Sequence, residues 1–105
     1  MSINLKIEAE NFGKGIGNLT RQGILEVLFD KPSSVSTIVK GTQYSQPLIS
    51  QHLKILKQCK LVKENRVGKE IIYELNTLTM KNFINSLSES INDYENYIQM
   101  VKSDN

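Results

Sequence analysis

The sequence feature that most constrains the fold is a regular spacing of apolar residues near the C-terminus. Across residues 77–102, apolar side chains recur at alternating steps of four and three residues. They are Met80, Ile84, Leu87, Ile91, Tyr94, Ile98 and Val101. This spacing places them on one narrow stripe of a long helix, as in a coiled coil. One small domain offers little core to such a stripe. The pattern therefore predicts that two copies pair along it, with Met80, Ile84, Leu87, Ile91, Tyr94 and Ile98 in the dimer interface.

A second helical pattern occupies residues 46–59. Its apolar face, at helical spacing, is formed by Ile49, His52, Leu53 and Leu56. Ser45 is suited to cap the start of this helix, and Pro47 fits the first turn, where a missing N–H does no harm. A shorter predicted helix at residues 36–42, capped by Ser36, precedes it across a tight turn. Two helices joined in this way can place the second one in the major groove of DNA.

Two further helices are predicted before this pair, at residues 3–16 and 20–30. Apolar residues at helical spacing indicate the second of them, and Pro32 ends it because proline cannot continue a helix. Glycines at positions 13, 15 and 17 weaken the end of the first helix and indicate a flexible join.

A β-hairpin is predicted after the central helices, with strands at residues 61–66 and 69–75 and a turn at Val67 and Gly68. Alternation along the second strand is typical of β structure. The predicted fold is therefore mainly α with a small β-hairpin, in the order α-α-α-α-β-β-α. It forms a single domain of residues 1–105.

Charge is distributed unevenly along the chain. Residues 37–75 carry seven basic and three acidic side chains, a net charge of +4, whereas residues 76–105 carry a net charge of −2. A basic middle segment favours a polyanionic partner, although a solvated basic surface would give the same count.

The candidate contacts with double-stranded DNA follow from this arrangement. Base edges are read by side chains near the start of a helix in the groove, and we expect this role for Ser45, Gln46, Pro47, Ser50 and Gln51. Phosphate contacts are expected farther along the helix at Lys54, at the hairpin tip from Arg66 and Lys69, and at a helix N-terminus from Thr20 and Arg21.

At residues 17–75 the chain resembles the ArsR-type (arsenic-repressor-like) family of winged helix-turn-helix regulators. The resemblance lies in Gly17-Asn18-Leu19-Thr20-Arg21, residues 44–56, Leu61-Val62, Arg66-Val67-Gly68-Lys69 and Tyr73-Glu74-Leu75. It implies a homodimer built from terminal helices at residues 1–18 and 76–105, with a DNA-binding core at 19–75. It also implies sequence-specific binding to an operator, expected to be an inverted repeat, and repression of transcription.

The sequence departs from the metal-sensing members of that family. They use cysteines in the third helix or aspartate and histidine pairs on the last one. Here the only cysteine is Cys59 and the only histidine is His52. We therefore predict no metal site and no cofactor, and the effector stays unknown. Cys59 is interpreted as a small buried hydrophobe rather than a redox sensor. His52 is interpreted as a half-buried residue that orients its neighbours, with a DNA-backbone contact or a pH switch as alternatives.

Several classes of function are disfavoured. No nucleophile–base pair or phosphate-binding loop indicates an enzyme. No apolar run is long enough for a membrane span, and a single cysteine does not build a disulfide framework, so a cytoplasmic protein without a membrane partner is expected. The alternative to DNA binding is a winged-helix module that binds another protein through its last helix.

Overall fold

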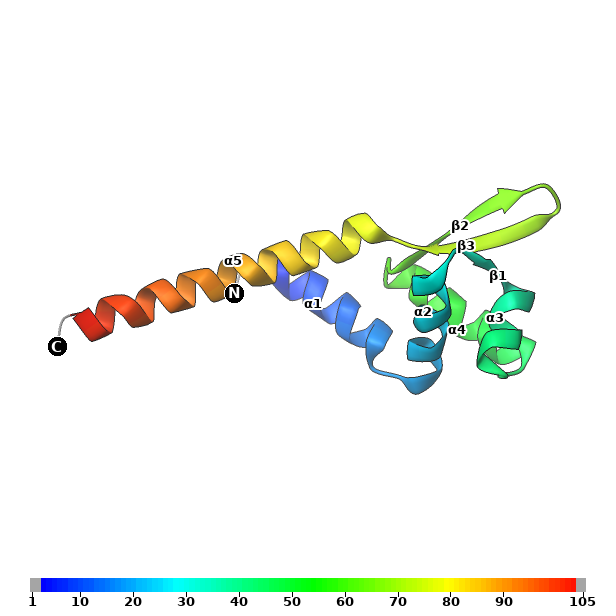
Figure 1. The fold of residues 1–105 in the computed structure, drawn as a ribbon, viewed down its shortest axis with the longest axis horizontal. Helices are drawn as coiled ribbons and strands as arrows, with labels where there is room; N and C mark the ends of the chain where they lie inside the picture. The colour runs from blue at the N-terminus through cyan, green and yellow to red at the C-terminus, as the bar shows by residue number, and fades with distance from the viewer. Residues whose placement is uncertain (1–2, 104–105) are drawn as a thin grey trace.

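The computed structural model describes residues 3–103 as five helices and three short strands (Figure 1). In chain order they are α1 (Ile3–Ile16), α2 (Leu19–Asp30), β1 (Ser33–Ser34), α3 (Val35–Thr42), α4 (Gln46–Gln58), β2 (Val62–Val67), β3 (Glu70–Leu75) and α5 (Thr77–Ser103). The predicted helices and the hairpin are therefore confirmed, and β1 is an addition. Positions 1–2 and 104–105 of the predicted single domain lie outside the described residues.

The molecule is long for its size because α5 projects from the rest of the chain (Figure 1). Its extents are 64 × 25 × 23 Å and its radius of gyration is 17.7 Å. A compact domain of this length would have a radius of gyration of about 13 Å. The chain thus divides into a winged head, residues 19–75, and an extended helix whose outer half lies beyond the head.

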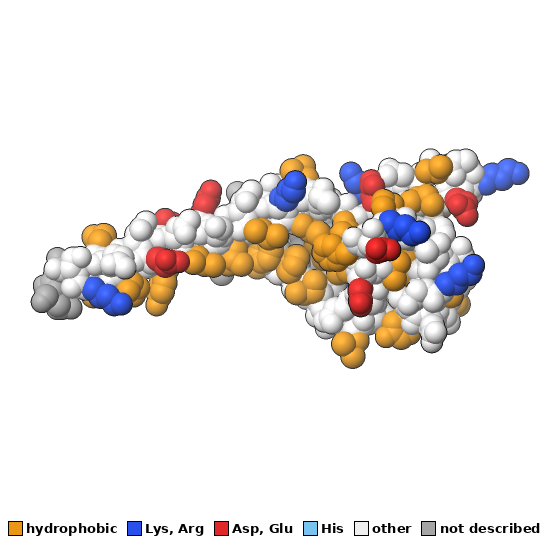
Figure 2. All heavy atoms as spheres, viewed as in Figure 1, with side chains coloured by type: hydrophobic (Ala, Val, Ile, Leu, Met, Phe, Trp, Pro, Cys, Tyr) orange, Lys and Arg blue, Asp and Glu red, His pale blue; other side chains and the backbone are white. Residues whose placement is uncertain are grey.

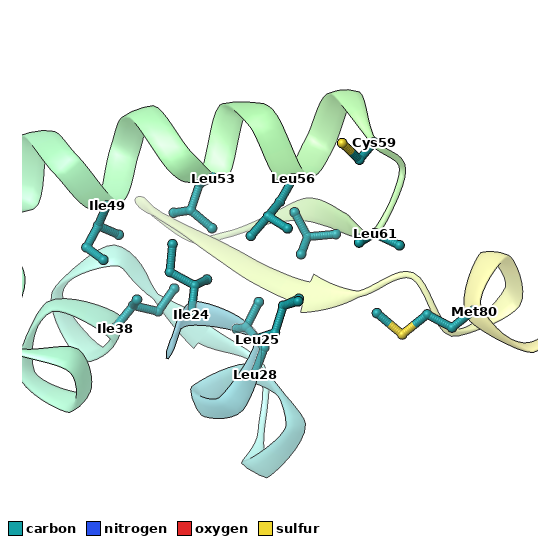
Figure 3. Packing of buried hydrophobic residues seen from close by; sticks show 11 residues of the cluster. Ile24, Leu25, Leu28, Ile38, Ile49, Leu53, Leu56, Cys59, Leu61 and Met80 are labelled. Carbon is teal, nitrogen blue, oxygen red and sulfur yellow. The ribbon is translucent and has the colours of Figure 1, made fainter. Parts of the chain in front are cut away.

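The hydrophobic core lies inside the head, where α2, α3 and α4 meet the base of the hairpin (Figure 3). Ile24, Ile38, Ile49 and Leu56 are completely buried. Cys59, at the C-terminal end of α4, is 2% exposed and packs in the same cluster, as expected for a small hydrophobe. The apolar face predicted for α4 is therefore the face that closes this core.

Polar side chains cap the starts of α2, α3, α4 and α5, the last through Asn76, whose Oδ1 accepts the Thr79 N–H at 3.3 Å. Asn18, Ser34 and Ser45 each accept a hydrogen bond from the backbone N–H three residues later, as N-cap residues do. The cap predicted at Ser45 is confirmed. The cap predicted at Ser36 is wrong, because Ser34 accepts the N–H of Thr37 and the helix begins at Val35.

The hairpin belongs to a three-stranded antiparallel sheet with the order β1-β3-β2. Val67 pairs with Glu70, so the turn is formed by Gly68 and Lys69, one residue later than predicted. Gly68 has a φ of 63°, a conformation that glycine adopts without a steric cost. Strand β1 pairs with β3 beside Tyr73 and Ile72, and two polar serines give no strand signal of their own.

The glycines near the end of α1 do not form the flexible join that the sequence predicts. Gly13 and Gly15 lie within the helix, and only the short stretch at positions 17–18 separates α1 from α2. Gly15 is buried, and a Cβ at this position would overlap the Leu61 side chain. The glycine therefore allows close approach between α1 and the base of the hairpin.

The start of α5 packs on the chain itself through Met80 and Phe83. Phe83 stacks against Phe12 of α1 with ring centroids 4.8 Å apart. Met80 is 9% exposed and belongs to the core of the head. The predicted place of Met80 in a dimer interface stays a prediction, since its side chain is largely buried within one chain, where the start of α5 packs along α1. Within residues 3–103 no helix is both long and apolar enough to cross a bilayer.

Candidate nucleic-acid interface

The outer face of α4 is the principal candidate surface, and it lies opposite the buried face. All six residues predicted to contact DNA from this helix are exposed, namely Ser45, Gln46, Pro47, Ser50, Gln51 and Lys54. They are exposed because Ile49 and Leu53 turn the other side of the helix into the core (Figure 3). We call these six residues the α4 surface.

Hydrogen bonds hold three side chains of the α4 surface in place. Gln46 donates from Nε2 to the Ser50 hydroxyl at 3.2 Å, one helical turn away. Ser45 accepts the N–H of Leu48 at 3.4 Å, which leaves its own O–H free to donate. The Oε1 of Gln46 stays available as an acceptor, so this end of α4 presents both donors and acceptors to solvent.

The wing, formed by β2, β3 and their turn, places Arg66 and Lys69 at its outer end. Both are exposed, and a basic side chain marks the tip of the hairpin in Figure 2. The wing and the α3–α4 pair lie at the same end of the molecule, away from the C-terminal end of α5 (Figure 1).

Two of the three acidic side chains in the basic segment are paired with lysines. Lys57 lies 2.9 Å from Glu64, and Lys63 lies 3.6 Å from Glu74. The hydrogen bond from Lys57 lowers the pKa of Glu64 and raises that of Lys57. Among residues 3–103 these are the ion pairs present, so Lys54 and Lys69 form none, whereas Arg66 lies close enough to Glu64 to help lower its pKa.

The start of α2 differs from the other candidate positions, because Arg21 is engaged inside the chain. Its guanidinium donates from Nη2 to the Lys14 carbonyl oxygen at 2.7 Å and from Nε to the Gly15 carbonyl oxygen at 3.1 Å. Its Nη1 lies 3.1 Å from His52 Nδ1. Thr20, the neighbouring candidate, is half-buried.

The contact between Arg21 and His52 has no counterpart in the sequence analysis. The two residues are 31 positions apart and lie on different helices, so no local pattern pairs them. Burial, and then the nearby Arg21, lower the pKa of His52 from its ordinary value. The interpretation of His52 as a half-buried residue that contacts its neighbours agrees with this geometry.

No three His, Cys, Asp or Glu side chains gather closely enough to hold a metal ion in the part of the chain that the structure describes. Cys59 is buried and has no second thiol in this sequence to pair with.

Sequence comparison places the chain beside known regulatory proteins, and two of its matches differ in the residues they cover. The family described as "Bacterial regulatory protein, arsR family" matches residues 18–64. The transcriptional repressor SdpR of Bacillus subtilis (strain 168) is 36% identical to this chain over 86 residues, which cover 82% of this chain and 96% of SdpR. The similarity thus extends beyond the family match and spans nearly the whole relative.

Comparison with solved structures finds the same fold. An ArsR-like transcriptional regulator from Rhodococcus sp. RHA1 superposes with a TM-score of 0.87 at 23% identity, covering 96% of this chain and 95% of that one. The homodimeric winged helix-turn-helix DNA-binding domain of Mb0332 from Mycobacterium bovis gives a TM-score of 0.67 at 24% identity and covers 90% of each chain. These likenesses show that the head is a winged helix-turn-helix.

Proposed function

This chain belongs to the arsR family of bacterial regulatory proteins, and we propose that it is a dimeric, sequence-specific DNA-binding repressor of transcription. The observation that carries the proposal is the α4 surface. A helix with one face completely buried presents polar, uncharged side chains at its start and an unpaired lysine farther along. That order suits base reading near the helix start and phosphate contact behind it.

Each part of the surface has a proposed role. Gln46 and Gln51 are suited to bidentate pairing with adenine, Ser45 and Ser50 to adaptable hydrogen bonds, and Pro47 to apolar contact with a thymine methyl group. Lys54 on α4 and the wing residues Arg66 and Lys69 contact phosphates. Thr20 adds a further phosphate contact at the start of α2. The phosphate contact expected of Arg21 stays a prediction, because its guanidinium is engaged by α1 and by His52.

The dimer is proposed from the exposed apolar side chains of α5. Ile84 is 58% exposed, Ile91 48% and Tyr94 66%, and Figure 2 shows hydrophobic side chains along the projecting helix. Together with Leu87 and Ile98 they form the proposed interface. We infer that the terminal helices at residues 1–18 and 76–105 join two copies, as the homodimeric state of the Mycobacterium bovis domain supports. Two heads related by a two-fold axis favour an inverted-repeat operator.

Selection of bound duplexes from a random-sequence library tests the function. The wild type is expected to enrich a half-site that occurs twice in inverted orientation. The double variant Gln51→Ala with Lys54→Ala is then expected to bind that duplex roughly ten- to a hundredfold more weakly, because a bidentate base contact alone contributes about 1–3 kcal/mol. Loss of a phosphate contact also lowers the dependence of affinity on salt by about one ion.

A matched control distinguishes the loss of contacts made by the α4 surface from the loss of any exposed glutamine and lysine. Gln58→Ala with Lys60→Ala removes the same two kinds of side chain from exposed positions at the last residue of α4 and just beyond it. This control is expected to bind like the wild type. Equal binding by both double variants contradicts the assigned surface.

The alternative, a winged-helix module that binds only proteins, predicts that no duplex is enriched. The DNA-binding role is favoured because the match covers 96% of SdpR, which is a transcriptional repressor. A role on chromosomal DNA also implies that the protein works in the cytoplasm.

A further inference from the structure

The guanidinium of Arg21 joins three helices, and one of them is the helix proposed to enter the major groove. Resting on the proposed function, we propose that Arg21 and His52 are a positioning pair that fixes α4 to the end of α1. In this role the pair sets how the α4 surface is held relative to the dimerisation helices, without touching DNA itself.

The position of Arg21 is better explained by α1 than by its own helix. Arg21 lies in the first turn of α2, where the helix dipole disfavours a cation. The carbonyl oxygens of Lys14 and Gly15 belong to the last turn of α1, where they have no partner within that helix and carry partial negative charge. The nearby Gln22 likewise donates from Nε2 to the Ile16 carbonyl oxygen at 2.6 Å. The start of α2 thus caps the end of α1.

The planar shape of the guanidinium allows it to reach α4 as well. Nε and Nη2 are directed at α1, and Nη1 is left to donate to His52 Nδ1 at 3.1 Å. A lysine ammonium is a point charge without this rigid fork, so it does not serve two helices in the same geometry. His52 immediately follows Gln51 of the α4 surface, so its ring is held next to a proposed base contact.

The pair requires a neutral His52. Arginine has no acceptor, so Nδ1 of His52 accepts the hydrogen bond and the ring proton is on Nε2. Protonation of Nδ1 would remove the acceptor and place two cations 3.1 Å apart. Burial and Arg21 both lower the pKa of His52, which favours the neutral ring. Arg21 of α2 is the one charged group in the described chain that shifts this pKa. No charged group of α3 or β2, which also pack on α4, does so.

The sign of the pH effect distinguishes this role from direct contact with DNA. The pKa of His52 is lowered in the folded chain from its ordinary value, so the intact pair is present at neutral pH and is lost as the pH falls through the lowered folded-state pKa. A positioning role therefore predicts weaker DNA binding in acid. A His52 that touched phosphate would bind more tightly in acid, because it would gain a positive charge facing the DNA.

The experiment measures affinity for the duplex selected by the wild-type protein, at constant salt, from about pH 7.5 to about pH 5. The wild type is expected to bind roughly three- to tenfold more weakly at the acid end, because only the neutral-His52 fraction is competent. His52 is the only histidine in the chain, so it is the side chain whose ordinary pKa lies in this range, and a transition that is absent from His52→Asn belongs to it. This measurement needs no variant, so it does not depend on how substitutions affect folding.

Variants of both residues complete the test. His52→Asn keeps an acceptor where Nδ1 stands but does not titrate, so it is expected to bind well with a flat pH profile. His52→Ala and Arg21→Lys are both expected to bind weakly at neutral pH, and Arg21→Lys is expected to keep the salt dependence of the wild type. A phosphate-contacting Arg21 predicts instead that Arg21→Lys binds like the wild type, because lysine replaces the charge, and that Arg21→Ala lowers the salt dependence by about one ion.

Affinity that rises in acid, or a pH profile that is unchanged in His52→Asn, overturns the positioning role while leaving the proposed DNA binding intact. Failure of the wild type to select any duplex overturns the proposed function and this inference together.

Discussion

The winged head and the outer part of α5 bury their apolar side chains to very different degrees. In the head, Ile24, Ile49 and Leu56 are 0% exposed, whereas Ile84 and Ile91 of α5 are 58% and 48% exposed. Both regions have strong apolar periodicity in the sequence. Apolar periodicity in a sequence therefore predicts that a helix has an apolar face. It does not predict whether that face packs within the same chain or against another one.

The largest contrast is expected between matched leucines in the two regions. Leu56→Ala in the head is expected to lower the free energy of unfolding by about 2–5 kcal/mol, because it leaves a cavity in a closed core. Leu87→Ala in α5 removes the same atoms from a side chain that is 40% exposed. Its smaller loss is expected to depend on protein concentration, because the lost contacts join two chains. Urea denaturation at two protein concentrations measures both, and equal, concentration-independent losses would break the contrast.

A charged residue among the exposed apolar side chains of α5 tests whether these side chains pair with a second copy. Ile91→Asp places a carboxylate in the proposed interface and is expected to weaken dimerisation by about tenfold or more, because a desolvated charge would lack a partner. The head is expected to stay folded, since Ile91 takes no part in its core. Sedimentation equilibrium measures the dimerisation, and circular dichroism the fold. Asn92→Asp, with the same charge one residue away from the stripe, is the control. Identical dimerisation by the two variants would count against the interface.

Within the head, a capping side chain is expected to matter less than a core side chain. Ser45→Ala removes the hydroxyl that accepts the Leu48 N–H and is expected to cost about 1 kcal/mol of stability. Ser50→Ala, on the same exposed face of α4 but inside the helix, is the matched control and is expected to leave stability nearly unchanged. Thermal denaturation distinguishes them, and a Ser45→Ala variant as stable as Ser50→Ala would show that this cap contributes little.

The smallest expected effect concerns the exposed ion pair between α4 and the wing. The hydrogen bond from Lys57 lowers the pKa of Glu64, so the pair contributes at neutral pH and its contribution is lost as the pH falls through the folded-state pKa. In Lys57→Met the pKa of Glu64 is expected to rise toward its ordinary value. An NMR titration of the Glu64 carboxyl carbon measures this shift, with the unpaired Lys60→Met as control. An unchanged Glu64 pKa would show that the pair is not formed in solution.

The sequence by itself determined the elements and the faces they present. Helical spacing identified α4 and α5, and Ser45, two residues before Pro47, identified the start of α4. The exposure of Ser50 and Gln51 followed from the burial of Ile49. These features are local: caps and periodic faces depend on residues within a few positions of one another.

Only the tertiary structure decided how those elements meet. Gly15 proved to be a point of close contact with Leu61, Met80 joined the core of the head, and two serines became a strand because β3 lies beside them. The contact between Arg21 and His52 spans 31 positions of sequence. Local patterns do not encode such contacts, because each depends on the packing of elements that are distant along the chain.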